Sequence, residues 1–166
     1  MTPAAPEDAV AALVAELAAR GLTVAVAESL TGGLLTAELI RPAGASAVVL
    51  GGAVCYATEL KRRVLGVDAE LLDEHGPVHP EVARQMADRV RSVLAVDGRA
   101  ADIGIATTGV AGPEPQGEHP AGLAYVGIAI GAAVESIELR LLGGRDAVRA
   151  GVVRRAVEEL GARLRG

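Results

Sequence analysis

The sequence predicts a three-layer α/β/α sandwich with a mixed sheet, folded as a single domain. Apolar, β-branched segments typical of buried strands alternate with segments that have the spacing of amphipathic helices. Two apolar segments late in the chain are separated by a short glycine-centred connection, which predicts an antiparallel hairpin. The chain has 166 residues, the size of one domain, and 51% of them are hydrophobic.

The first part of the chain predicts a helix followed by a strand, a helix and a second strand. Apolar residues recur at helical spacing over residues 7–19, and Gly21 closes that helix. "TVAVAES", residues 23–29, reads as a buried strand that runs into a sharp turn. Helical spacing resumes over residues 31–41, and "AVVLGGAVCY", residues 47–56, predicts the second strand.

The middle of the chain predicts helices. Residues 58–65 form a short helix with Thr58 as its N-cap and Gly66 as its stop. Residues 68–75 predict another short helix. A longer helix of about four turns begins at Pro80, since proline is favoured in a first helical turn.

The last third predicts strands and a final helix. "ADIGIATTG", residues 101–109, is a strand that enters a loop rich in glycine and proline, residues 109–121. Residues 123–130 and 134–142 form the expected hairpin, and the final helix runs from Asp146 to about Leu164.

Composition favours a small-molecule partner. The net charge is −5 and the pI is near 5.2, which opposes direct nucleic-acid binding. Cys55 is the only cysteine, so no disulfide framework or cysteine metal cluster is expected, in keeping with a reducing cytoplasm. No segment has the length of a membrane span, and residues 1–6 are expected to be disordered.

The motif "AESLTGG" places Ser29 at the end of the first strand. Thr31, Gly32 and Gly33 then open the following helix, where backbone N–H groups and the helix dipole favour a phosphate or an oxyanion. The alternative is a purely structural helix cap with a tight turn, which these residue types form routinely.

Lys61 is the only lysine among the 16 basic residues, and it stands directly before Arg62 and Arg63. Lysine differs from arginine in that it is readily deprotonated, and a neutral amine is a general base. A position in the first turn of a helix, beside two cations, lowers the pKa of Lys61. The alternative is an ordinary solvated lysine.

Other candidates are weaker individually. The Tyr56 hydroxyl is placed to orient the lysine or the nucleophile, unless it is simply a buried phenol. Arg145 starts the last helix and would make an anion clamp or a solvated charge. The loop "TTGVAGPEPQG" offers hydroxyl and N–H groups without the spacing of a P-loop; its candidate substrate contacts are Thr107, Thr108, Gly109 and Gly112.

No metal site is expected. His75 and His79 are four residues apart, but Gly76 and Pro77 between them break the helix that would aim both rings at one ion.

Four motifs together resemble the CinA C-terminal-domain family, the nicotinamide-nucleotide amidohydrolases. They are "AESLTGG", "YATELKRRVLGV", "TTGVAGP" followed by "HPAGLAYVGIA", and "GGRDAVR", and the resemblance covers residues 7–164. It implies a domain that usually self-associates, as a homodimer or higher oligomer. It also implies hydrolysis of nicotinamide mononucleotide to nicotinate mononucleotide and ammonia without a cofactor. Some members carry a further N-terminal domain, for which this chain is too short.

The resemblance assigns the family's serine, tyrosine and lysine to Ser29, Tyr56 and Lys61. Its ligand-contacting stretches match Thr108, Gly109 and Arg145. The sequence departs from the usual pattern at Leu30, Thr58, His79 and His119. His119 stands where a lysine is usual, which leaves open an amidohydrolase with a different carboxamide substrate. A non-catalytic nucleotide-binding module, linked to competence or DNA-damage responses, is the other alternative.

Overall fold

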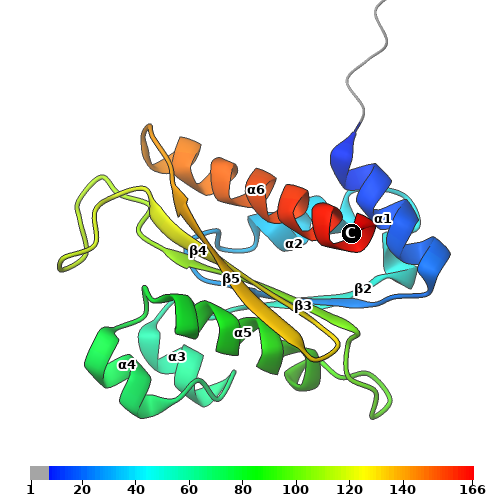
Figure 1. Ribbon diagram of the computed structural model, residues 1–166, viewed down its shortest axis with the longest axis horizontal. Helices are drawn as coiled ribbons and strands as arrows, with labels where there is room; N and C mark the ends of the chain where they lie inside the picture. The colour runs from blue at the N-terminus through cyan, green and yellow to red at the C-terminus, as the bar shows by residue number, and fades with distance from the viewer. Residues whose placement is uncertain (1–7) are drawn as a thin grey trace, which may run out of the picture.

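A computed structural model of the protein, which describes residues 8–166, has the predicted three-layer α/β architecture (Figure 1). The expectation that residues 1–6 are disordered lies outside the described residues. A five-stranded sheet with the order β2-β1-β3-β4-β5 forms the middle layer. β1 pairs in parallel with β2 and β3, whereas β3, β4 and β5 pair antiparallel, so the sheet is mixed as predicted.

The strands lie close to their predicted positions. Their bounds are β1 Val24–Glu28, β2 Val49–Val54, β3 Ile103–Gly109, β4 Leu123–Ile130 and β5 Ala133–Arg140. β1 and β3 are almost completely buried, because helices cover both faces of the sheet. β4 and β5 form the expected hairpin, with Gly131 in a left-handed conformation between them.

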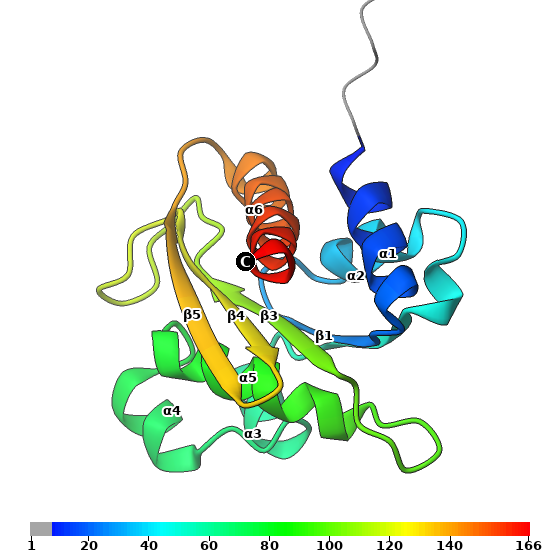
Figure 2. The same ribbon diagram turned by 45° about the vertical axis from the view of Figure 1, so that its right-hand side comes forward.

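Helices form the two outer layers (Figures 1 and 2). One face carries α1 Ala9–Arg20, α2 Leu34–Ile40 and α6 Arg145–Arg165, and the other carries α3 Thr58–Arg63, α4 Ala69–His75 and α5 Pro80–Val93. A short 3₁₀ turn spans Ala45–Ala47. None of the described helices is both long and apolar enough to cross a membrane.

Two glycines in the strands allow α5 to lie directly on the sheet. A β-carbon at Gly104 would stand 1.7 Å from the Ala87 carbonyl oxygen, and one at Gly127 would stand 2.0 Å from that of Ala83. Any side chain at either position would therefore push α5 away. This close approach explains why glycine stands at these positions in β3 and β4.

The helix caps correct one prediction. Thr58 is the first residue of α3, and Ala57 occupies the N-cap without a side-chain hydrogen bond. Because Thr58 already has a helical backbone, its hydroxyl is not the cap that the sequence predicted. At α5, His79 is the N-cap, and its Nδ1 accepts the Glu81 backbone N–H at 3.1 Å.

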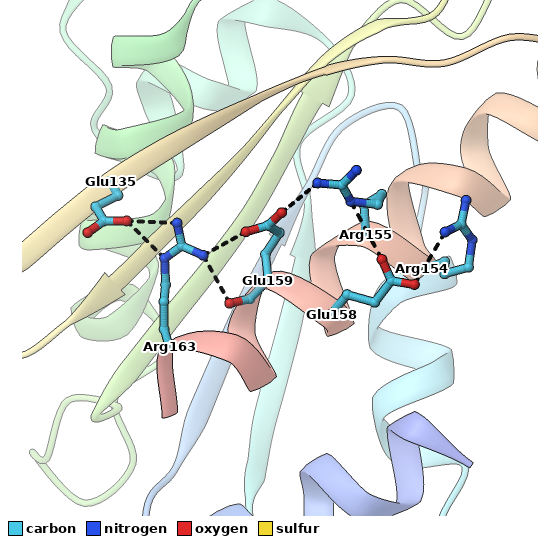
Figure 3. A network of polar contacts seen from close by, with 6 residues as sticks. All are labelled: Glu135, Arg154, Arg155, Glu158, Glu159 and Arg163. Carbon is cyan, nitrogen blue, oxygen red and sulfur yellow. Dashed lines mark hydrogen bonds and ion pairs between the residues drawn. The ribbon is translucent and has the colours of Figure 1, made fainter. Parts of the chain in front are cut away.

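The arginines of α6 form a surface network with carboxylates (Figure 3). Arg163 joins Glu135 of β5 to Glu159 of its own helix, with both contacts at 2.8 Å. Arg155 contacts Glu159 and Glu158, and Arg154 continues the network to Glu158. Surface pairs contribute only about 0.2–1 kcal/mol each. The Arg163–Glu135 pair joins α6 to the edge strand β5.

Candidate active site

The candidate site lies at the carboxyl ends of the three parallel strands. In the sheet register, Glu28 at the end of β1 is paired with Val54 of β2 on one side and with Thr107 of β3 on the other. The residues that follow each strand therefore emerge at the same edge, where ligands bind in sheets of this kind. Ser29 follows β1 directly, and the segment after β2 leads into α3, which carries Lys61.

Lys61 and Ser29 are in contact inside the protein. The Lys61 Nζ lies 2.9 Å from the Ser29 Oγ, and the two residues are 1% and 7% exposed. The same Nζ donates to the Cys55 carbonyl oxygen at 2.8 Å and approaches the Tyr56 carbonyl oxygen at 3.4 Å. These three oxygens surround the amine. Lys61 is therefore not a solvated surface lysine.

Burial lowers the pKa of Lys61 to about 8. The direction agrees with the sequence-based expectation, but its physical cause is different. Removal of the ammonium from water produces the shift, whereas the expectation attributed it to the helix dipole and to Arg62 and Arg63. The Arg62 guanidinium is turned toward solvent, where it pairs with Glu59.

A buried carboxylate that the sequence analysis did not single out organises the turn after Ser29. Glu28 is fully buried, and its Oε2 accepts the backbone N–H groups of Gly33 and Leu35, both at 3.0 Å. Its Oε1 accepts the N–H of Thr36 at 2.8 Å and the Thr36 hydroxyl at 2.6 Å. The first turn of α2 thus directs its N–H groups at Glu28 and away from a ligand.

This arrangement corrects the predicted oxyanion donors. Gly33 donates to Glu28, and the Gly32 N–H donates to the Ser29 carbonyl oxygen at 3.1 Å. Within residues 8–166, the backbone N–H groups of Leu30 and Thr31 have no protein acceptor. Leu30 lines the pocket, whereas Thr31 is fully buried and does not line it. The N–H group available to an anion beside Ser29 is therefore that of Leu30, which is outside the predicted set.

A pocket of about 390 Å³ opens in front of the serine–lysine pair. Of the predicted site residues, those that line it are Ser29, Tyr56, Lys61, Thr108, Gly109, Gly112 and Arg145. Thr31, Gly32, Gly33 and Thr107 do not line it, and neither does His119. Leu30, Pro77 and Val78 are lining residues that the sequence did not identify.

The three threonines hold the site together. The hydroxyls of Thr31 and Thr107 are fully buried and hydrogen-bonded to each other at 2.7 Å, which ties the turn after β1 to β3. The Thr108 hydroxyl donates to the Pro77 carbonyl oxygen at 2.7 Å and fixes the segment before α5. The sequence analysis expected these hydroxyls to contact substrate. In the structure they instead form hydrogen bonds that hold neighbouring segments of the site together.

Tyr56 and Arg145 meet at the mouth of the pocket. Tyr56 is 61% exposed, and its hydroxyl accepts a hydrogen bond from the Arg145 Nη2 at 3.1 Å. The Arg145 Nη1 donates to the Gly112 carbonyl oxygen at 2.8 Å. The Tyr56 hydroxyl therefore orients the arginine, whereas the sequence analysis placed it against Lys61 or Ser29. Tyr56 reaches the lysine only through its backbone oxygen.

His75 and His79 lie against each other at the start of α5. His75 and His79 stack with their ring centroids 4.6 Å apart, and the His79 Nδ1 caps α5. In the part of the chain that the structure describes, no group of three or more His, Cys, Asp or Glu residues is arranged to hold an ion.

The fold and the site together define a class: α/β domains with a buried serine–lysine pair that faces a pocket at the carboxyl edge of a mixed sheet. The family model for the CinA C-terminal domain matches residues 7–164. The chain belongs to this family.

Relatives and solved structures agree with this assignment. A CinA-like protein of Frankia casuarinae is 44% identical over 150 residues, which cover 90% of this chain and 34% of that protein. A putative competence-damage inducible protein of Geobacillus kaustophilus is 47% identical over 131 residues, or 78% of this chain and 30% of that protein. The chain thus spans about a third of the length of these curated relatives.

Solved structures match over almost the whole chain. A CinA superfamily protein of Klebsiella pneumoniae has a TM-score of 0.89 and 34% identity, and the match covers 95% of this chain and 96% of that one. A competence/damage inducible protein of Agrobacterium tumefaciens has a TM-score of 0.84 and 35% identity over 96% of this chain and 98% of that one.

Proposed function

We propose that this protein is an amidohydrolase that converts nicotinamide mononucleotide into nicotinate mononucleotide and ammonia, with Ser29 as nucleophile and Lys61 as general base. The observation that supports this best is the buried contact of 2.9 Å between the Lys61 Nζ and the Ser29 Oγ. A serine hydroxyl is a weak nucleophile unless an adjacent base removes its proton. Lys61 is placed to do so when its amine is neutral.

The surroundings of Lys61 suit a neutral amine. A neutral amine has two N–H groups and one lone pair, and the carbonyl oxygens of Cys55 and Tyr56 accept the two N–H groups. The lone pair is then directed at the third neighbour, the Ser29 hydroxyl. The backbone thereby orients the base without a further side chain.

In the proposed reaction, the Ser29 Oγ attacks the carboxamide carbon while its proton passes to Lys61. The tetrahedral intermediate then collapses: the carbon–nitrogen bond breaks, and Lys61 returns the proton to the leaving ammonia. Water attacks the resulting ester and gives its proton to Lys61. The carbon–Oγ bond breaks, and the proton returns to Ser29 as the carboxylic acid leaves and ionises.

The negative oxygen of the tetrahedral intermediate requires hydrogen-bond donors. We assign this task to the backbone N–H group of Leu30, which lines the pocket and has no protein acceptor within residues 8–166. In other enzymes, the loss of one such donor costs about 2.7–4 kcal/mol of transition-state stabilisation.

Arg145 is the proposed anchor for the 5′-phosphate. Its contacts with Gly112 and Tyr56 use two of the five guanidinium N–H groups and fix their direction at the pocket mouth. The remaining N–H groups are donors for a phosphate. Thr108, Gly109 and Gly112 would line the space between the phosphate and the reacting carboxamide.

A substrate panel tests this function. Ammonia release should be detectable with nicotinamide mononucleotide, and kcat/KM should fall by about 10- to 100-fold with nicotinamide riboside, because the charge-assisted bonds to the phosphate are lost. Equal kcat/KM values for the mononucleotide and the riboside would contradict the proposed phosphate site. Preference for an unrelated carboxamide would show that nicotinamide mononucleotide is not the substrate. Tight nucleotide binding with no ammonia release from any carboxamide would indicate a non-catalytic binding module.

The pH dependence of kcat/KM follows from the Lys61 pKa of about 8. The base is active only when neutral, so kcat/KM should rise about tenfold per pH unit below pH 8 and level off above it. The measurement is ammonia release at subsaturating substrate between pH 6 and pH 10. A profile that is flat from pH 6 to pH 9 would contradict the assignment of Lys61.

A further inference from the structure

The segment between α4 and α5 forms one wall of the pocket, and a histidine stands at each end of it. Pro77 and Val78 of this segment line the pocket. His75 is the last residue of α4, and His79 is the N-cap of α5. The two imidazole rings stack, with their centroids 4.6 Å apart and their planes inclined by 20°. The stack therefore joins the two ends of the segment that carries the pocket wall.

The His79 ring also holds the start of α5. Its Nδ1 accepts the Glu81 backbone N–H at 3.1 Å. Pro80, the first residue of the helix, has no N–H, so Glu81 carries the first backbone donor of α5. A protonated imidazole has an N–H at both ring nitrogens and cannot accept a hydrogen bond. The cap therefore exists only while the His79 ring is neutral.

Val78 connects this cap to the pocket. Its side chain is 2% exposed and faces the sheet, where it packs in a small apolar cluster with Ala83, Val110, Leu123 and Tyr125. Val110 lines the pocket as well, so the two valines hold parts of the same cavity together. Because Val78 directly precedes His79 in the chain, a movement at the cap reaches a pocket-lining side chain without an intermediate.

The surroundings of His79 disfavour a positive charge on its ring. Partial burial lowers the pKa of His79 most, the stacked His75 ring lowers it further, and His119 of the loop after β3 adds to this shift. The Glu81 carboxylate acts in the opposite direction. Glu74 lies 3.7 Å from the His75 Nε2. All three histidines of the chain thus act on one another beside the pocket wall.

The direction of this shift sets the pH range in which the cap is lost. A histidine in an unfolded chain titrates near pH 6.5, and the pKa of His79 in the folded protein is lower. The folded state therefore binds fewer protons than the unfolded state, and the contribution of the neutral ring to stability is complete above pH 6.5. It is lost as the pH falls through the lower pKa of the folded protein.

We infer that His75 and His79 form an acid-sensitive clasp, which keeps the Pro77–Val78 wall of the pocket in place while the His79 ring is neutral. Protonation of that ring removes the N-cap of α5 and sets a positive charge against the stacked His75 ring. The wall is then held by the Thr108–Pro77 hydrogen bond and by the packing of Val78. The clasp concerns the shape of the pocket and does not depend on the proposed reaction.

An NMR titration between pH 5 and pH 7.5 tests the clasp without a ligand. In wild type, the His79 ring should titrate below pH 6.5. The nuclear Overhauser effect between the methyl groups of Val78 and Val110 should weaken with the same midpoint. In His79→Ser this effect should not depend on pH, because a serine hydroxyl caps a helix and does not titrate in this range.

Two further histidine variants complete the titration. His119→Gln is the matched control, because it removes a histidine that takes no part in the cap or the stack. The pH-dependent change at Val78 should persist in it. His75→Gln removes the stack and leaves the cap, so the His79 ring should titrate at a higher pH and the midpoint at Val78 should move with it. This variant also serves if His79→Ser does not fold.

Urea denaturation gives a second measure of the clasp. Between pH 7 and pH 5, the urea midpoint of wild type should fall by roughly 0.5 M more than that of His79→Ser, which is the decrease that the loss of one typical N-cap produces. The comparison with His79→Ser cancels the titration of groups that both proteins share.

The outcomes separate the clasp from the proposed function. A change at Val78 that persists in His79→Ser would overturn the clasp, and so would a His79 ring that titrates with no change at Val78. Equal pH dependence of the two urea midpoints would also overturn it. None of these measurements uses a substrate, so the absence of ammonia release from every carboxamide would overturn the proposed function and leave the clasp standing.

Discussion

Replacing Lys61 with arginine should lower kcat for ammonia release by about 1,000-fold, close to the rate of Ser29→Ala. General base catalysis contributes about 100- to 10,000-fold in enzymes, and a guanidinium cannot be deprotonated in a protein. The arginine would keep a positive charge beside the Ser29 Oγ, which now lies 2.9 Å from the amine, and would leave the hydroxyl without a proton acceptor. Steady-state ammonia release at pH 9, where wild-type Lys61 is mostly neutral, measures the loss.

Two further variants separate chemistry from packing. Lys61 is only 1% exposed, so a bulkier arginine strains its slot, whereas Lys61→Met fits within the slot and removes the amine. Lys61→Met should be inactive and still show a cooperative thermal transition. Arg62→Met alters the next residue, which is exposed and paired with Glu59, and should retain activity. Full activity in Lys61→Arg or Lys61→Met would exclude the lysine as the base.

The order of helices and strands could be predicted because apolar periodicity records which face of each segment is buried. The segments expected over residues 123–130 and 7–19 correspond to β4 and α1, with shifts of only a residue or two at the helix ends. The N-cap of α3 was predicted wrongly. Threonine is a common N-cap, but whether it serves as one depends on the backbone conformation of that residue, which the residue type does not determine.

The positions of the candidate site residues were more predictable than their contacts. Ser29 and Lys61 end up together because the carboxyl ends of parallel strands meet at one edge, which a sequence of alternating strands and helices already implies. The partner of the Tyr56 hydroxyl was not predictable, because Arg145 is 89 positions away in the chain. The catalytic roles of these residues stay predictions.

Glu28 and Arg149, whose guanidinium donates to the Leu30 and Thr31 carbonyl oxygens, were overlooked for a related reason. A glutamate at the end of a strand and an arginine in a helix are both ordinary as sequence, and only three-dimensional contacts reveal what they hold. The local signals were present: Glu28 is the one charged residue in an otherwise apolar strand, and Arg149 follows Arg145 at helical spacing. A charge in a fully buried strand requires partners, which is the rule that would have identified Glu28.

Replacing Glu28 with glutamine should lower the free energy of unfolding by about 3 kcal/mol. The carboxylate accepts three backbone N–H groups and one hydroxyl without exposure to solvent. Glutamine has nearly the same shape, but one of its two polar ends is an NH₂ group. That end would face the N–H groups of Gly33 and Leu35 or of Thr36, donor against donor, and each buried donor left without an acceptor costs about 1–3 kcal/mol.

Urea denaturation measures this loss, which should also appear as a decrease in Tm of roughly 6–12 °C for a chain of this size. Glu38→Gln is the matched control, because Glu38 lies within α2, the helix whose first turn Glu28 holds, but its carboxylate is partly exposed and pairs with Arg41. That variant should stay within about 0.5 kcal/mol of wild type. A Glu28→Gln protein as stable as Glu38→Gln would mean that the turn after Ser29 does not depend on the buried carboxylate. The start of α2 would then have to be held by its backbone hydrogen bonds, the Thr31–Thr107 hydroxyl pair and Arg149.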